Sequence, residues 1–310
     1  MTDLEVNYRA EKIWNQISEK NLTAADVYHI QQSFGYDIAC GILYKTFKEQ
    51  PAFVEFAKGA ENSQSAKGSF YNNANRDVLA AVFVHNPWES RKTNENYQWR
   101  LKNVAADMGF DCAYPEISYR RSVFPNAYTY QETMKRWAGR DVILITQGLA
   151  SLEMRLVLEK SIQINANIIG WLNVSGMTYG TSLPATDRDT FYKIKKYFND
   201  DYAVLPEVAR SNGFCYGPLK TNQQIEMVNM VGIRPQRYFH FFEKKREQEL
   251  HYWGPHDGYV TIADYLQKPG VTWPFWGQSH YLSTEIYKRR FQYALHWLVS
   301  KYRHKDTVSL

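Results

Sequence analysis

Two turns in the last quarter of the sequence carry side chains suited to acid–base chemistry. Asp257 lies in GPHDGYV (254–260), and His280 lies in GQSHYL (277–282). A histidine oriented by a carboxylate is a general base that works near neutral pH. The apolar run VTWPFW (271–276) separates the two, and we expect it to be a strand that carries the chain from one turn to the other. The order and spacing favour an Asp257–His280 dyad over the alternatives, a turn-forming Asp-Gly pair and a structural histidine.

The segment VILITQGLAS (142–151) raises the question of a nucleophile. Four aliphatic residues run into a turn of small residues, and an amphipathic stretch follows. Such a passage from strand to helix can present a nucleophile at the helix N-terminus. Residue 148, at the turn, is glycine, which has neither the oxygen nor the sulfur that covalent acyl transfer needs. Ser151 falls one turn into the expected helix and Thr146 falls on the strand side, so neither takes the exposed position.

The composition is that of an ordinary globular protein with many aromatic residues. Of the 310 residues, 44% are hydrophobic and 22% are charged, which suits one large core with or without an inserted cap. Aromatic residues make up 15% of the chain and favour an aromatic-lined pocket, so we expect a small-molecule ligand. The net charge of +5 is spread along the chain. Nucleic-acid binding usually needs a concentrated basic face, so no nucleic-acid partner is expected.

No motif predicts a metal or a cofactor. The three cysteines are widely spaced and form neither a disulfide framework nor a metal pattern. His251, His256, Asp257 and His280 are residue types that suit zinc, but their spacing matches no compact motif. No cleavable leader and no apolar run of membrane-spanning length is found, so we expect a cytoplasmic protein without membrane contact.

The first quarter of the chain is expected to be helical. Residues 4–19 place apolar side chains on one helical face, Thr23 opens a capping box, and a third helix is expected at 35–48. We interpret residues 1–57 as a helical N-terminal extension and the polar stretch 58–77 as a linker. An exposed apolar face on the first helix would favour a homodimer or a protein partner.

From residue 78 onward, strands alternate with helices. This alternation predicts a mostly parallel sheet with helices on both faces. The alternation of strands and helices is interrupted at residues 177–250, which we interpret as an inserted cap. The core would then comprise residues 78–176 and 251–310.

The order of these features resembles the α/β-hydrolase family, whose chain order is nucleophile, acid and histidine. The resemblance covers most of residues 78–310 and is most specific at HDGYV, PGVTWPFWG and SHYL. It implies an α/β-hydrolase-like fold with Asp257 as the acid, His280 as the base and Gly148 at the nucleophile position. The glycine departs from the family pattern of a serine between small residues.

The resemblance also implies an oxyanion hole and a pocket. The hole would use the N–H of Leu149 and the turn HNPW (85–88), in which Pro87 has no N–H and Trp88 or Asn86 would donate. Residues of the turns that would line the pocket are His85, Asn86, Trp253, Trp276 and Tyr281.

Three functions remain open at this point. The first is a pseudoenzyme without the usual nucleophile, which binds a small apolar ligand or a protein partner with little or no hydrolase activity. The second is an active esterase or thioesterase, with an unrecognised nucleophile or with residue 148 changed from its natural identity. The third is a cofactor-free lyase, isomerase or oxygenase in which the His280–Asp257 dyad removes a substrate proton.

Overall fold

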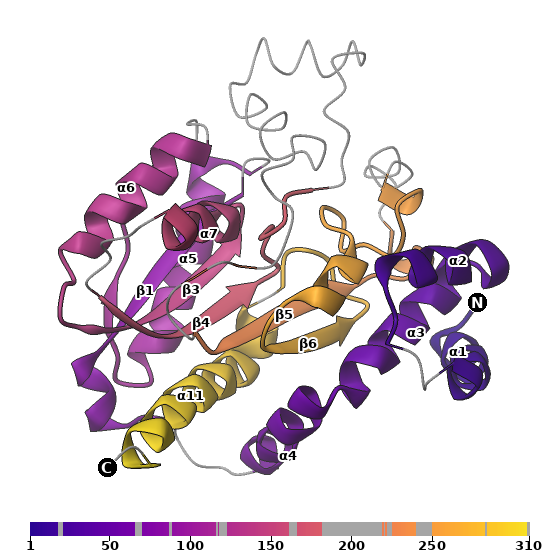
Figure 1. Ribbon diagram of the computed structural model, residues 1–310, viewed down its shortest axis with the longest axis horizontal. Coiled ribbons are helices and arrows are strands. Elements are labelled where there is room, and N and C mark those ends of the chain that lie inside the picture. The colour runs from indigo at the N-terminus through magenta and orange to yellow at the C-terminus, as the bar shows by residue number, and fades with distance from the viewer. Residues whose placement is uncertain are drawn as a thin grey trace, which may run out of the picture.

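A parallel sheet lies at the centre of the protein in the computed structural model (Figure 1). The structure describes residues 1–17, 21–65, 70–86, 89–115, 117, 123–160, 166–181, 219, 221, 225–239, 250–282 and 284–308. Within these ranges the sheet has six strands, in the order β2-β1-β3-β4-β5-β6. The strands are β1 (Val78–His85), β2 (Asp111–Ala113), β3 (Asp141–Gly148), β4 (Asn167–Val174), β5 (Met227–Ile233) and β6 (Val271–Trp276).

Apart from the short edge strand β2, the strands are mainly apolar because both faces of the sheet are covered. A parallel strand between two layers of helices buries every side chain and therefore has a nearly continuous apolar sequence. All eight residues of β1 are buried, and alternate side chains enter two separate apolar clusters. One cluster contains Leu79, Ala81 and Phe83, and the other contains Val78, Ala80, Val82 and Val84.

Helices form a layer on each face of the sheet. α6 (Val123–Lys135) and α7 (Ala150–Lys160) contribute to the first cluster. The second cluster is closed by α4 (Pro51–Ser65), α5 (Arg91–Ala106) and α11 (Thr284–Val308). Figure 1 shows α4 and α11 on one side of the sheet and α6 and α7 on the other. None of the helices in the described ranges has the length and apolarity that a bilayer crossing requires.

The chain order of the strands creates a switch point between β1 and β3. From β1 the chain first adds β2 on one side and then crosses to β3 on the other side. In open parallel sheets, ligands bind at the carboxyl ends of the strands at such a switch point. His85, at the end of β1, lies in register with Gly148 at the end of β3. The turns after these two strands therefore meet at this edge.

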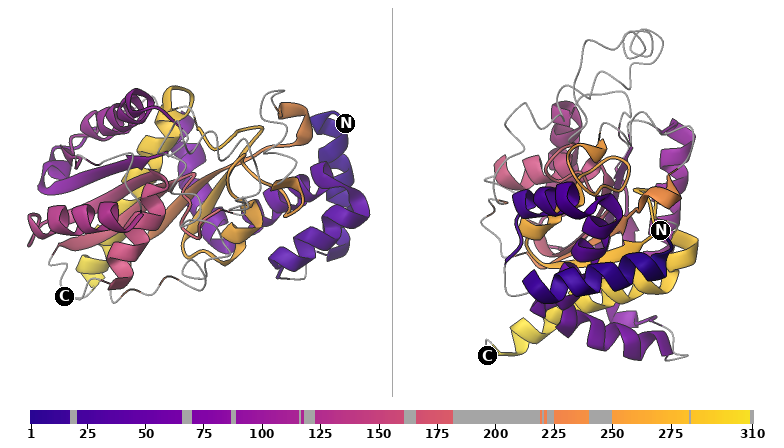
Figure 2. Two further views of the ribbon diagram at one scale, coloured as in Figure 1. Left: turned by 90° about the horizontal axis from the view of Figure 1, so that it is seen from above. Right: turned by 90° about the vertical axis from the view of Figure 1, so that its right-hand side faces the viewer.

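Of the helices that precede the sheet in the described residues, the first three group beside its β6 edge (Figure 2). They are α1 (Asp3–Ile17), α2 (Ala24–Phe34) and α3 (Tyr36–Glu49). The capping box predicted at Thr23 is confirmed, since its side chain accepts a hydrogen bond from the Asp26 N–H and the Asp26 carboxylate accepts one from the Thr23 N–H. This reciprocal pair fixes the start of α2.

The apolar face of α1 is covered by α3. Val6, Ala10 and Trp14 are buried, and the last two share an apolar cluster with Ile38 and Ile42 of α3. The Trp14 indole N–H also donates to Glu49 at 2.7 Å. The face is thus used inside the chain, and association through the N-terminal helices stays a prediction.

The segment 58–77 differs from the expected linker. Residues 58–65 complete α4, and residues 73–77 form a 3-10 helix that leads into β1. α4 forms because its apolar residues have a partner that lies far away in the sequence. The Phe56 ring packs 4.9 Å from both the Trp273 and the Tyr293 rings, and the Tyr293 hydroxyl donates to the Phe56 carbonyl at 2.7 Å.

The range 177–250, expected to be a cap, contains a core strand. β5 lies between β4 and β6 and is buried at all seven positions. Periodicity alone does not distinguish a buried strand from a buried helix in a short apolar run of this kind, so the sequence pattern does not reveal β5. Residues 182–218, 220, 222–224 and 240–249 of the expected cap lie outside the described residues, and a cap there stays a prediction.

Candidate active site

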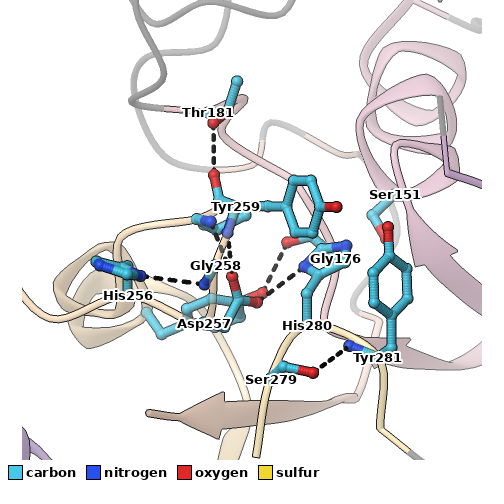
Figure 3. Close-up of polar contacts among 12 residues, drawn as sticks. Ser151, Gly176, Thr181, His256, Asp257, Gly258, Tyr259, Ser279, His280 and Tyr281 are labelled. Atoms are coloured by element: carbon cyan, nitrogen blue, oxygen red, sulfur yellow. Dashed lines mark hydrogen bonds and ion pairs between the residues drawn. The ribbon is translucent and has the colours of Figure 1, made fainter. Parts of the chain in front are cut away.

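Asp257 and His280 form a fully buried hydrogen-bonded pair (Figure 3). The His280 Nδ1 atom lies 2.9 Å from the Asp257 Oδ2 atom. The other carboxylate oxygen accepts hydrogen bonds from the backbone N–H groups of Tyr259 at 2.9 Å and Val260 at 2.8 Å. The backbone N–H of His280 donates to the Asp257 carbonyl at 2.7 Å. The turns after β5 and β6 are therefore joined by both main-chain and side-chain contacts.

The carboxylate of this pair is held in its ionised form. Burial by itself would raise the pKa of Asp257, but the attraction of His280 and the hydrogen bonds from His280, Val260 and Tyr259 outweigh it and hold the pKa below its usual value. The ionised carboxylate fixes which ring nitrogen of His280 carries the proton. The opposite nitrogen, Nε2, is buried and has no hydrogen-bond partner in the described part of the chain. It is the atom that would exchange a proton with a reacting group.

The local sequence and α3 together shape the acid turn. Gly258 adopts φ 108°, a left-handed conformation that glycine tolerates best, and this lets the chain fold back so that the Asp257 carboxylate reaches the next two N–H groups. The Gly258 N–H donates to His256 Nδ1 at 3.2 Å. The His256 N–H in turn donates to the Tyr36 hydroxyl of α3 at 3.1 Å.

The turn after β3 has the strand-to-helix form that the sequence predicts, but its interior is occupied. Gly148 ends β3 with φ 65°, and α7 begins two residues later. A Cβ atom at residue 148 would lie 2.7 Å from the His85 carbonyl oxygen and would overlap the Asn86 amide oxygen. The Leu149 N–H donates to the same His85 carbonyl at 2.7 Å. The chain itself thus fills the side-chain space and uses the N–H group of this turn.

The Asn86 amide group occupies part of the space beside Gly148. Its side chain is fully buried, and neither the amide oxygen nor the amide nitrogen has a hydrogen-bond partner among the described residues. The backbone of Asn86 is fixed by Asn94 of α5, whose amide group accepts from the Asn86 N–H at 2.7 Å and donates to the Asn86 carbonyl at 3.1 Å. A buried amide without partners costs free energy unless a bound molecule satisfies it.

The hydroxyls closest in sequence to Gly148 belong to a structural network. The Ser151 hydroxyl donates to the Asn173 amide oxygen at 2.7 Å and lies 2.8 Å from the Thr146 hydroxyl. Thr146 also accepts a hydrogen bond from the Trp171 indole N–H at 2.7 Å. Both hydroxyls are fully buried. They link β3, β4 and α7, and neither is presented at the turn.

A second buried pair lies beside the same turn. His85 Nδ1 is 2.7 Å from Glu153 Oε1 of α7, and the Asn126 amide of α6 donates to the same oxygen at 2.9 Å. The sequence predicts His85 as a pocket residue, but no sequence pattern points to Glu153 or Asn126. No local signal links these residues, because 68 positions separate His85 from Glu153.

The turn after β4 contains a strained serine. Ser175 has φ 45° and is the one non-glycine residue with positive φ in the ranges that the structure describes. Its N–H donates to the Met230 carbonyl at 2.8 Å, whereas its buried hydroxyl has no hydrogen-bond partner in those ranges. The carbonyl of the next residue, Gly176, accepts a hydrogen bond from the Tyr265 hydroxyl at 2.7 Å. A strand followed by Ser-Gly was the signal available in the sequence.

The aromatic residues expected in the pocket have different surroundings. The Tyr281 ring lies 5.4 Å from the His280 ring and stacks on Tyr97 of α5. Trp276 packs against Tyr44 of α3, and Trp253 is 51% exposed. Trp88, expected to donate in the oxyanion hole, lies outside the described residues.

A cavity of about 420 Å³ lies along α5. It is lined by Arg91, Glu95, Asn96, Gln98, Trp99, Lys102, Tyr114, Pro115 and Ile117. None of these residues belongs to either buried pair, so the cavity is not a substrate pocket that these pairs line.

Comparison with known proteins identifies the fold. No family model and no curated protein sequence matches the chain. The crystal structure of the metagenomic carboxyl esterase MGS0156 is similar, with a TM-score of 0.52, 14% identity, and coverage of 76% of this chain and 77% of that chain. The Bacillus licheniformis lipase BlEst2 has a TM-score of 0.48, 12% identity, and coverage of 71% and 94%. At 14% identity the likeness to the carboxyl esterase shows the fold alone. The protein has an α/β-hydrolase-like fold, as predicted from the sequence.

Proposed function

We propose that this protein hydrolyses carboxylic esters with Asp257 and His280 as its acid–base pair, and that residue 148 carries no nucleophile. The observation that carries the proposal is the pair itself, in which an ionised carboxylate orients a buried histidine whose Nε2 atom has no partner in the described residues. The fold supports the same reaction class, because the solved structure with the TM-score of 0.52 is a carboxyl esterase.

In this mechanism His280 removes the proton from the oxygen that attacks the ester carbonyl. The ionised Asp257 holds the ring in the required orientation and stabilises the imidazolium that forms. His280 then returns the proton to the departing alcohol. General base and acid catalysis of this kind contributes about 10²–10⁴-fold to the rate.

The test is hydrolysis of short p-nitrophenyl esters by the protein and two variants. We expect turnover by the unmodified protein and a loss of about 10²–10⁴-fold for His280→Ala. The matched control is His29→Ala, which removes an exposed histidine and should leave the rate unchanged. No turnover by the unmodified protein, or equal rates for the two variants, would rule the proposal out.

A second candidate is a binding protein without turnover, which the occupied turn at Gly148 favours. The His85 carbonyl and the Asn86 amide fill the space that a side chain at residue 148 would need, and Leu149 donates its N–H to His85. This candidate expects no ester turnover, but a rise in thermal stability with short acyl amides that satisfy the Asn86 group. The rise should persist in His280→Ala and be lost in Asn86→Leu.

A further inference from the structure

We propose that Ser175 is the nucleophile of this site, one strand away from the turn at Gly148. The inference rests on the proposed ester hydrolysis and names the oxygen that attacks. It is carried by the backbone conformation of Ser175, by its buried hydroxyl without a partner, by the neighbouring N–H group, and by the contacts that join this turn to the acid turn.

The backbone at Ser175 is strained. A serine at φ 45° costs free energy that glycine would avoid, and such strain persists where the surrounding structure enforces it. The Ser175 N–H donates to the Met230 carbonyl of β5, which holds the residue at the end of β4. A strained residue at the end of a parallel strand is typical of the turn that holds a catalytic nucleophile in this kind of sheet.

The surroundings of Ser175 contrast with those of Ser151. The Ser151 hydroxyl is engaged by Asn173 and by Thr146, whereas the Ser175 hydroxyl is equally buried and has no hydrogen-bond partner in the described chain. Burying a hydroxyl without a hydrogen-bond partner is unfavourable. We infer that the bound substrate supplies the partner of the Ser175 hydroxyl.

The N–H group after Ser175 is available to an oxyanion. Of the described residues, none accepts a hydrogen bond from the Gly176 N–H, whereas Leu149 has already given its N–H to His85. Only glycine fits at residue 176, since a Cβ atom there would overlap the Ser151 hydroxyl and the Asn173 amide. The N–H of the residue after the nucleophile is the donor that stabilises the negative oxygen in this reaction class.

The turn after β4 is bonded to the acid turn, residues 254–260, and to the 3-10 helix Ile262–Gln267 that follows it. The Tyr265 hydroxyl donates to the Gly176 carbonyl at 2.7 Å. Burial raises the pKa of Tyr265 well above its usual value, and the negative charge of Asp257 adds to this effect. The Thr181 hydroxyl donates to the Tyr259 carbonyl at 2.5 Å, and the Tyr259 ring lies 4.8 Å from the His280 ring. Figure 3 shows Gly176 and Thr181 in the same group of residues as Asp257 and His280.

The reaction balances with water as the second substrate. The Ser175 oxygen bonds to the ester carbonyl carbon while its proton passes to His280 Nε2. The carbon–oxygen bond to the alcohol then breaks, and the alcohol leaves with that proton. Water attacks the acyl-serine, gives a proton to His280, and releases the carboxylic acid as the proton returns to Ser175.

The test combines covalent labelling with three serine variants. A fluorophosphonate probe should add its mass to the peptide that contains Ser175 in the unmodified protein. Ser175→Gly should lose the label and at least 10³-fold in kcat with KM little changed, while its Tm stays equal or rises, because glycine accepts φ 45° without strain. Ser175→Ala should lose the same activity. This second variant shows that the loss comes from the missing hydroxyl and not from the greater backbone freedom of glycine. Ser151→Ala should still be labelled at Ser175.

The outcomes separate this inference from the proposed function. If the Ser175 variants keep turnover while His280→Ala loses it, Ser175 is not the nucleophile and the ester hydrolysis stands. A label on another residue overturns the inference in the same way. If the unmodified protein neither turns over esters nor reacts with the probe, both proposals fail.

Discussion

At the scale of the residue, the buried Asp257 carboxylate couples the stability of the protein to pH. Its pKa is held below the usual value despite burial, because His280 and three hydrogen bonds favour the ionised form. A group whose pKa is lower in the folded state stabilises the fold above its unfolded pKa, and this contribution is lost as the pH falls through the folded pKa.

We therefore expect the free energy of unfolding to fall as the pH drops below about 4, the pKa of an aspartate in an unfolded chain. The measurement is urea unfolding between pH 7 and pH 2. Asp257→Asn removes the titrating group and should flatten this part of the profile. Asp107→Asn, at an exposed aspartate, should keep the profile of the unmodified protein. Identical profiles for the unmodified protein and Asp257→Asn would contradict the coupling.

Gly148 has a positive φ and no room for a side chain, so a serine introduced there should destabilise the fold and should not act as a nucleophile. We expect Gly148→Ser to lose about 2–4 kcal/mol of stability, from the left-handed backbone and from overpacking against the His85 carbonyl, and to gain no esterase activity. Gly139→Ser is the matched control, since Gly139 has φ 76° and an added Cβ atom would meet no atom within 4 Å. Thermal unfolding should show a smaller loss for it. Equal losses would mean that crowding at residue 148 is not the cause.

At the scale of the element, α3 supports the acid turn through one hydroxyl. Tyr36 accepts a hydrogen bond from the His256 N–H and donates to the Arg234 carbonyl at 3.3 Å. Its ring also stacks on His251 with centroids 4.4 Å apart. The helix and the turns after β5 therefore form one packed unit.

Tyr36→Phe should keep the ring contacts and remove the hydroxyl. We expect a loss of about 1–3 kcal/mol, because the buried His256 N–H is left without its acceptor. The loss should be accompanied by weaker ester turnover, since Asp257 directly follows His256. Tyr8→Phe removes an exposed hydroxyl from α1 and serves as the control in chemical unfolding and activity assays. If both variants match the unmodified protein, α3 does not support the turn.

The sequence alone predicts those elements whose signals are local. The capping box at Thr23 and the strand-to-helix passage at Gly148 involve neighbours within a few residues, and both are confirmed. β5 and α4 were not predicted because their burial depends on partners far away in the chain. The contact between Asp257 and His280 is also present, as expected from their order. The sequence does not predict the roles of Glu153 and Ser175. Hydrogen bonds between distant residues and a positive φ angle have no effect on the hydrophobic periodicity of a sequence.

At the scale of the whole molecule, the N-terminal helices are part of the core. Tyr36, Leu43 and Phe47 of α3 belong to the same buried cluster as the strands. Each large buried side chain contributes about 2–5 kcal/mol, and a whole domain has a net stability of only about 5–15 kcal/mol.

Deleting residues 1–50 should therefore abolish the cooperative unfolding transition. Deleting residues 1–17, which removes only α1, should lower the Tm and keep the transition, since α1 packs mainly on α3. Differential scanning calorimetry distinguishes the two deletions. A cooperative transition in the longer deletion would show that the sheet is stable without α3.

The bond between Tyr36 and His256 also has a consequence for biosynthesis. Its two partners are 220 positions apart, and the ribosome adds about 5–20 residues per second. About 11–44 s therefore pass between the synthesis of Tyr36 and the synthesis of His256. During that interval the apolar face of α3 has no sheet edge to cover it. Such long-range pairing slows folding and leaves the nascent chain open to aggregation, so a chaperone that shields the first helices during translation should raise the yield of native protein.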